Sequence, residues 1–157
     1  MSTIADYQGR TIDVFAFDGV IPDGEALLDQ QLFDDKQSGL VCTGIQKLAQ
    51  RFILELLTDK GSMYGKPDNG TGLLRAYRES TVRSEMDAAQ EWAFAVNEAL
   101  ANMRKEEADT DPDDERIDTV ELDNVAFAAG IKVAYHAKLT SRAGASRTVV
   151  LPLPIVL

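Results

Sequence analysis

The sequence contains a single cysteine, Cys42, and a single histidine, His136, among its 157 residues. One cysteine cannot form a disulfide within the chain or supply a multi-cysteine zinc site. One histidine excludes a cluster of imidazoles. Because disulfides are rare in reducing compartments, this cysteine usage is typical of a protein that folds in a cytoplasm. We therefore expect neither a bound metal nor a cofactor.

Long apolar runs and an excess of basic residues are also missing. No segment approaches the roughly 18 apolar residues that span a bilayer. Residues Met1 to Gln8 lack the basic and apolar regions of a secretory signal. Sixteen Lys and Arg residues stand against 26 Asp and Glu residues, which gives a net charge of −10. Because phosphate binding depends on clustered cations, we expect no nucleic acid and no membrane among the partners.

The charge is distributed unevenly along the chain. The last acidic residue is Asp123, and residues 124–157 carry only the four positive charges of Lys132, Lys138, Arg142 and Arg147. Residues 1–124 therefore carry −14, from 12 bases and 26 acids. Two interpretations stay open: a basic end that contacts a partner or another copy head to tail, and a solvated sheet face guarded by lysines.

The chain divides into two parts, and hydrophobic residues, at 45%, are numerous enough for a packed core. Residues 1–42 are weakly patterned and are interpreted as an N-terminal arm, in which the alternation of Thr11–Phe17 predicts a short strand. Residues 43–157 are interpreted as an α+β domain. We expect two long amphipathic helices packed on a small C-terminal β meander, with extended N- and C-terminal arms.

Two apolar stripes predict the two long helices, and as the only long apolar faces they should pack together. Thr43 is a favourable N-cap for the first helix, and Gly61 is placed to take the left-handed conformation that ends it. Ser84, with Asp87 three residues later, predicts the start of a second helix roughly 30 Å long. The stripes consist of Ile45, Leu48, Ala49, Phe52, Ile53, Leu56 and Leu57, and of Met86, Ala89, Trp92, Ala93, Val96, Leu100 and Met103.

The chain after the second helix is patterned as a loop followed by strands. The acidic run Glu106–Glu115 is broken by Pro112, which predicts an exposed loop. Thr119–Phe127 alternates between polar and apolar residues, but its phase shifts near Asp123-Asn124, which predicts a β-bulge or a break. A clean alternation over Ile131–Leu139 and a last extended segment, Arg147–Leu157, complete a meander.

The search for catalytic and metal-binding patterns is mostly negative. Asp109, Asp111 and Asp113 have the spacing of a calcium loop, but the glycine position is Asp114 and the twelfth position is Val120, so a solvated acidic loop is the better interpretation. Cys42 and His136 would meet only through the tertiary fold. Glu55 lies among apolar residues, yet helical periodicity places it off the apolar stripe, which favours a solvated carboxylate over a catalytic one.

Two motifs in sequence order resemble the lysozyme-like baseplate wedge proteins of contractile-tailed phages, the family that initiates the tail sheath. After the first helix the chain reads Lys60-Gly61-Ser62 and then Lys66-Pro67-Asp68-Asn69-Gly70, similar to the family's Gly-x-x … Pro-Asp-x-Gly loop. After the second helix, Glu115-Arg116-Ile117 resembles its Glu-Pro-Arg-hydrophobic motif, although the proline is absent and Pro112 lies three residues earlier. The likeness extends over residues 43–157. It rests on Gly61, Pro67, Asp68, Gly70, Glu115 and Arg116.

The resemblance implies structural work and no catalysis. Residues 43–157 would be a wedge domain that joins the baseplate to the first sheath ring by strand exchange, in multiple copies of a symmetric assembly. Its partners would be other baseplate wedge proteins and the tail sheath protein. The protein would reside in the virion after assembly in the host cytoplasm. Two alternatives stay open: a peptidoglycan hydrolase, as the family's name suggests, and a small adaptor or chaperone of another assembly.

The C-terminal segment carries the predicted partner strand, Val149, Leu151, Leu153 and Ile155. Alternate residues of a strand direct their N–H groups to the same side, so Pro152 and Pro154 remove donors from one edge only. A strand from another chain could then add to the remaining edge. The alternative is an edge strand of the protein's own sheet, in which the prolines block aggregation.

Overall fold

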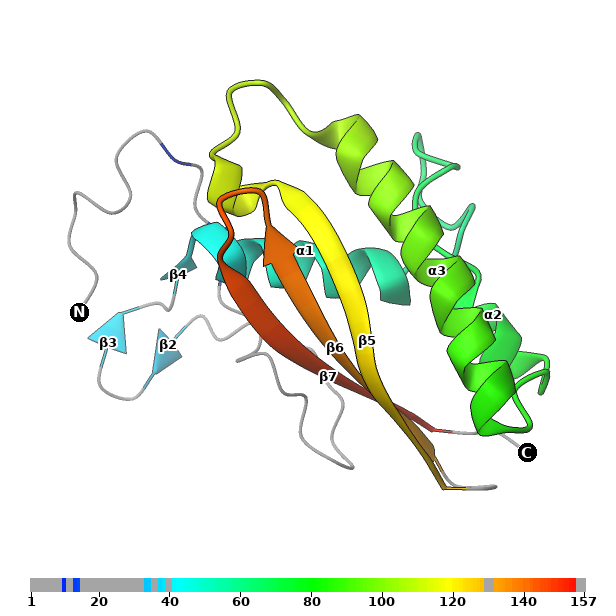
Figure 1. Ribbon diagram of the computed structural model, residues 1–157. Helices are drawn as coiled ribbons and strands as arrows, with labels where there is room; N and C mark the ends of the chain where they lie inside the picture. Colours follow the sequence, from blue (N-terminus) through cyan, green and yellow to red (C-terminus); the bar gives the residue numbers. More distant parts are fainter. Residues whose placement is uncertain are drawn as a thin grey trace.

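Helices and an antiparallel sheet form the body of the protein (Figure 1). The computed structural model describes residues 10, 13–14, 33–34, 37–38, 41–128 and 132–154. Its helices are α1 (Gly44–Leu57), α2 (Leu73–Arg78) and α3 (Glu85–Glu106), with a 3₁₀ turn, η2 (Asp113–Glu115). The main sheet has the order β5 (Ile117–Ala128), β6 (Lys132–Ser141), β7 (Ser146–Pro154). The predicted α+β class is thus confirmed.

Four short strands belong to the N-terminal part of the chain. β1 (Asp13–Val14) pairs with β4 (Val41–Cys42), and β2 (Phe33–Asp34) pairs with β3 (Gln37–Ser38). The strand predicted over Thr11–Phe17 is therefore present at its centre, and the other residues of that segment lie outside the described part of the chain. β4 leads directly into α1, so the end of the arm is continuous with the domain.

α1 is capped at its start by a side chain distant in the sequence. The predicted N-cap, Thr43, makes no side-chain cap hydrogen bond. The N–H of Gly44 instead donates to Oε1 of Glu115, over 3.1 Å. Gly44 has a φ of +61°, and a Cβ at this position would lie 2.8 Å from a carboxylate oxygen of Asp114. Glycine therefore allows the acidic turn η2 to approach the helix end.

The buried stripe of α3 agrees in part with the expected one, and Ala89 and Leu100 are partly buried against the core. Ser84 does cap the helix, since its hydroxyl accepts the N–H of Asp87. Trp92, Val96 and Met103 are buried as predicted, but Met86 and Ala93 are exposed. Three alanines, Ala88, Ala95 and Ala99, are buried in addition. Small side chains on this face let α3 lie close to its neighbours.

The core lies between the helices and one face of the sheet. α1 packs against β6 and β7, and α3 packs against α1 and β5 (Figure 1). Trp92 stacks on Tyr135 with ring centroids 4.5 Å apart, and Phe52 meets Trp92 edge-on at 6.4 Å. The predicted contact between the stripes centred on Phe52 and Trp92 is therefore confirmed. The Tyr135 hydroxyl donates to the Ala88 carbonyl and shares a second hydrogen bond, 2.6 Å long, with the Tyr77 hydroxyl.

The sheet shows the predicted irregularity. The pairing of β5 with β6 shifts by one residue between Leu122 and Asn124, where the alternation of the sequence changes phase. The shift returns Val125 to the buried face, on which Leu122 is also partly covered. A second shift, between Ile117 and Thr119, was not expected. Within the described ranges, no helix is long and apolar enough to cross a bilayer.

Candidate functional site

The loop between α1 and α2 carries four of the six motif residues and is closed at its base by backbone hydrogen bonds. The N–H of Thr71 donates to the Thr58 carbonyl at 2.8 Å, and the N–H of Lys60 donates to the Thr71 carbonyl at 3.1 Å. Gly70 has a φ of +88°, and a Cβ there would lie 2.4 Å from the carbonyl oxygen of Thr58. Only glycine fits this closure. Gly61 also has a positive φ, but it follows the helix end by four residues, so it is not the predicted helix cap.

Glu55 fastens this loop to both long helices. Its Oε1 atom accepts the N–H of Gly70 and the side-chain amide of Asn102 on α3, each at 2.7 Å. The same amide lies 3.2 Å from the carbonyl oxygens of Asp68 and Gly70. The expectation of a solvated Glu55 is therefore wrong. Helical periodicity places it off the apolar stripe correctly, but the loop folds back over that side of α1.

Further ionic contacts join the loop to the length of α3. Glu98 receives the Lys60 ammonium at 2.8 Å and the N–H of Gly72 at 3.1 Å. About two turns further along α3, Glu106 accepts hydrogen bonds from the side chains of Lys66 and Asn69. These hydrogen bonds, Lys66 first and Asn69 second, lower the pKa of Glu106 below its usual value. Glu98 thus holds the two ends of the loop, and Glu106 holds the segment that contains Lys66 and Asn69.

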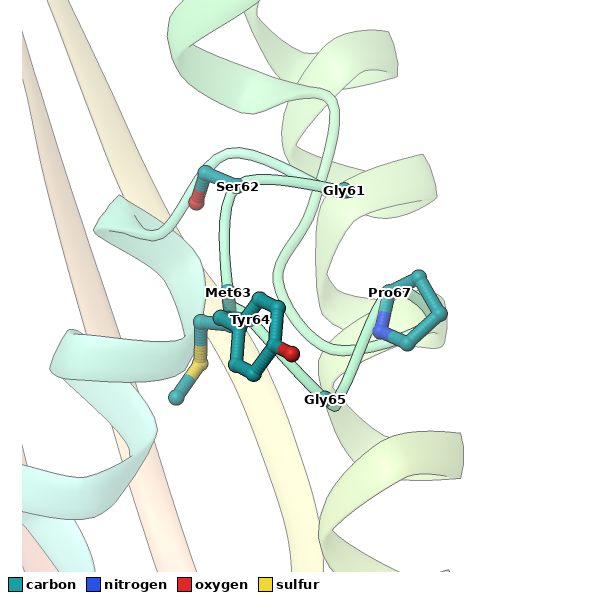
Figure 2. A pocket seen from close by; sticks show the side chains of 6 residues that line it. All are labelled: Gly61, Ser62, Met63, Tyr64, Gly65 and Pro67. Carbon is teal, nitrogen blue, oxygen red and sulfur yellow. The ribbon is translucent and has the colours of Figure 1, made fainter.

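The tip of the anchored loop is apolar and open to solvent. Tyr64 is fully exposed, and Met63 is 43% exposed. Figure 2 shows both side chains standing out from the loop backbone. They border an open hollow that is lined by Gly61, Ser62, Met63, Tyr64, Gly65 and Pro67. A tyrosine on a fixed support is typical of protein docking sites, where it buries a large area with few rotatable bonds.

Glu115 forms a second junction at the other end of α1. Its side chain is only 3% exposed, and its Oε2 atom accepts the Lys47 ammonium at 2.6 Å. Its other oxygen caps α1 through Gly44. Beside it, Arg10 of the N-terminal arm binds both carboxylate oxygens of Asp114, at 2.7 and 3.0 Å. The acidic turn η2 therefore joins the arm, the start of α1 and the sheet.

Arg116, the residue after Glu115, is less buried and lies among three carboxylates. Its guanidinium is within 3.7–3.8 Å of Glu107, Asp109 and Asp113, but Nε makes no hydrogen bond. Glu107 makes the shorter contacts: it accepts the N–H of Ile117 at 2.8 Å and the Arg142 guanidinium at 2.7 Å. The acidic segment is therefore only partly an exposed loop, since Glu107 and Glu115 turn inward.

The six motif residues form two groups at opposite ends of α1. Gly61, Pro67, Asp68 and Gly70 belong to the loop after the helix, whereas Glu115 and Arg116 lie at the junction before it. A 14-residue helix separates these ends by about 20 Å. Sequence reasoning gave no role to Lys47, Glu107 and Asn102, and it interpreted Glu55 as solvated. Each is a polar residue on a helix or beside its end, and no sequence signal distinguishes it from a solvated one.

The partner-strand residues lie within the protein's own sheet. Val149, Leu151 and Leu153 are buried, and they pair with Ala137, Tyr135 and Val133 of β6; Ile155 lies outside the described residues. Because prolines lack an N–H, Pro152 and Pro154 direct their missing donors away from β6. The edge that they leave intact is occupied by β6, as in the alternative of an edge strand of the protein's own sheet.

The residues with catalytic potential are placed in structural roles. Burial, followed by the charge of Asp13, raises the pKa of the Cys42 thiol to about 11, so the thiol is protonated at neutral pH. Burial likewise raises the pKa of Tyr77 to about 12 and that of Tyr135 further. His136 lies on β6, opposite Asn124 and Val150. In the part of the chain that the structure describes, no three acidic, histidine or cysteine side chains are grouped as metal ligands.

Comparison with models of known protein families, with curated proteins and with solved structures gave no match.

Proposed function

We propose that the protein is a non-catalytic structural component of a contractile phage tail, a baseplate wedge protein that joins the baseplate to the first sheath ring. The proposal starts from the resemblance of the loop Gly61–Gly70 and of the Glu115-Arg116 motif to that family. It places the protein in the virion, with other wedge proteins and the sheath protein as partners.

The observation that carries the proposal is the contrast between the base and the tip of the loop. Glu55, Glu98 and Glu106 hold the base on two helices. Met63 and Tyr64 project from it into solvent. A loop that is already ordered loses less conformational entropy when it docks, so such a support favours tight binding to a neighbour. The open hollow beside Tyr64 offers room for a side chain of that neighbour.

A structural role also agrees with the use of the polar residues. A glycosidase needs a carboxyl group that is free to exchange a proton with its substrate. Glu55 accepts two hydrogen bonds that fasten the loop, and Glu115 is bound by Lys47 and the start of α1. Releasing either carboxylate for catalysis would therefore break a junction of the fold. Hydrolysis of purified peptidoglycan by the isolated chain would contradict this part of the proposal.

Replacement of Met63 and Tyr64 in the native genome tests the docking role. The double variant Met63→Ser, Tyr64→Ala should fold normally, because both side chains lie outside the core, but should yield particles without an assembled sheath by electron microscopy. Leu54→Ser is the matched control, since it removes an exposed apolar side chain from α1. Normal tails from the double variant, or a native genome that produces no contractile tail, would overturn the proposal.

A further inference from the structure

The loop between α1 and α2 contains the only Asn-Gly pair of the sequence, Asn69-Gly70. The backbone nitrogen that follows an asparagine can attack the side-chain amide, and glycine leaves this nitrogen most accessible because it has no Cβ. The fold nevertheless requires glycine here, since a Cβ would lie 2.4 Å from the Thr58 carbonyl oxygen. It also uses the Asn69 amide, which donates to Glu106. The closure of the loop therefore retains a chemically labile pair.

We propose that Asn69 is a site of spontaneous deamidation, and that the anchoring of the loop suppresses the reaction in the folded protein. The Gly70 nitrogen gives its proton to hydroxide and bonds to Cγ of Asn69. The bond from Cγ to Nδ2 breaks, and Nδ2 takes a proton from water and leaves as ammonia. Water then opens the cyclic imide at either carbonyl, which gives aspartate or isoaspartate. Water is consumed, ammonia is released, and no oxidant or reductant takes part.

The attacking nitrogen is held by a carboxylate of α1. Gly70 is buried, and its N–H donates to Oε1 of Glu55 at 2.7 Å. Loss of this proton would leave a negatively charged nitrogen against a carboxylate oxygen. Because like charges at this distance repel, the neighbouring carboxylate disfavours the deprotonated form of the amide. Glu55 therefore protects the nitrogen as long as the loop stays in place.

The amide under attack is held by a carboxylate of α3. Asn69 is half-buried, and its Nδ2 atom donates to Oε1 of Glu106 at 2.9 Å, a contact that is lost when Nδ2 departs. Its backbone N–H donates to the Lys66 carbonyl at 3.2 Å, and Asn102 binds the carbonyl of the next residue at the same distance. The imide ring includes the Cα–C bond of Asn69, so its formation turns a backbone that is fixed on both sides. Reaction therefore requires local opening of the loop.

Deamidation would change how the loop is attached to α3. Aspartate would present a carboxylate to Glu106 where the amide of Asn69 now donates, and the two charges would repel. Isoaspartate would add a methylene to the backbone beside Gly70, which already fits closely against Thr58. Neither product restores the original contacts, so an opening that is followed by reaction is irreversible. No partner takes part in these steps, and the inference is therefore independent of the proposed function.

Peptide mapping by mass spectrometry measures the reaction in the full chain. Samples are incubated in mildly alkaline buffer, either folded or in guanidinium chloride. We expect deamidation at Asn69 in both, at a rate at least about tenfold lower in the folded protein, because the reaction requires local opening. The remaining asparagines precede residues with a side chain and are internal controls that should keep their amides: Asn97, Asn102 and Asn124.

Three variants test the two anchoring carboxylates. Glu106→Ala removes the acceptor of the side-chain amide, and Glu55→Ala removes that of the backbone N–H. Each should raise the rate several-fold in the folded protein and leave it unchanged in denaturant. Glu98→Ala is the matched control, since the hydrogen bonds of Glu98 hold the ends of the same loop and go to other residues. Circular dichroism confirms folding, and Glu106 lies near the surface, so its variant should fold even where Glu55→Ala does not.

The outcomes that would overturn the proposal are specific. They are equal rates in folded and unfolded protein, no reaction at Asn69 in denaturant, or an acceleration by Glu98→Ala as large as that by Glu106→Ala. Deamidation adds a negative charge, so ion exchange isolates the product, which should melt at a lower temperature than the parent; an equal melting temperature would refute the weakened attachment to α3. A failure of the assembly test of Met63 and Tyr64 would leave all these rates unchanged, so the two proposals fail separately.

Discussion

Removing the charge of Glu115 tests the junction at the start of α1. Glu115 and Lys47 are both buried, with 2.6 Å between the carboxylate and the ammonium. Breaking a buried pair by removing one partner typically costs about 3–5 kcal/mol, because the remaining charge is desolvated without compensation. For a domain of this size 1 kcal/mol shifts the melting temperature by about 2–4 °C, so Glu115→Gln should lower it by roughly 6–20 °C.

Two further variants separate the charge from the helix cap. Glu115→Gln keeps an oxygen that can accept the Gly44 N–H, whereas Glu115→Ala also removes the cap and should cost about 1 kcal/mol more. The double variant Lys47→Met, Glu115→Leu replaces both charges by apolar side chains and should be more stable than Glu115→Ala. Thermal and urea unfolding followed by circular dichroism measure all three. A melting temperature for Glu115→Gln within about 2 °C of the parent would refute the reasoning.

Four other predictions concern the core, the loop and the thiol. Trp92→Ala should cost about 3–5 kcal/mol in urea unfolding, because the indole contacts two other core rings. Gly70→Ala should destabilise more than Gly65→Ala, since both have positive φ but only Gly70 faces a backbone carbonyl at contact distance. Cys42 should react with a thiol reagent about 100-fold more slowly when folded, from its pKa of about 11 against 9.0. The hydrogen bonds that lower the pKa of Glu106 stabilise the fold fully above pH 4.5, and this stabilisation is lost as the pH falls through the folded pKa. Glu106→Gln should therefore lower the melting temperature more at pH 7 than in acid.

The periodic elements of the fold were predictable because their signals are local. The apolar stripe of α1 and the change of phase at Asn124 can each be recognised within a short stretch of sequence, and both are found in the structure. The stripe of α3 was assigned less well, because alanine occurs on buried and exposed faces alike. Ala93 and Ala99 have the same chemistry, and only the position of α1 and β5 decides which is buried.

The two junctions were not predictable in the same way. Glu55 and Glu115 lie 60 residues apart, and each acts on a backbone N–H that is distant in the sequence. A carboxylate on a helix or in an acidic run is usually solvated. The local sequence therefore favours solvated side chains at both positions. The neighbour of β7 was not predictable either. Pro152 and Pro154 identify one edge of the strand as blocked, but only the tertiary fold shows that β6 occupies the other edge.

The packing of α1 against β7 has a consequence for synthesis on the ribosome. Phe52, Ile53 and Leu56 belong to the same core as Val149 and Leu151, yet Leu57 and Ser146 are separated by 89 residues. At translation rates of about 5–20 residues per second, roughly 4–18 s pass between the synthesis of α1 and that of β7, the strand that helps to cover its apolar face. A nascent chain halted before β7 therefore presents that face to chaperones or to other nascent chains, and the complete sheet can close over it only once synthesis has passed Pro154.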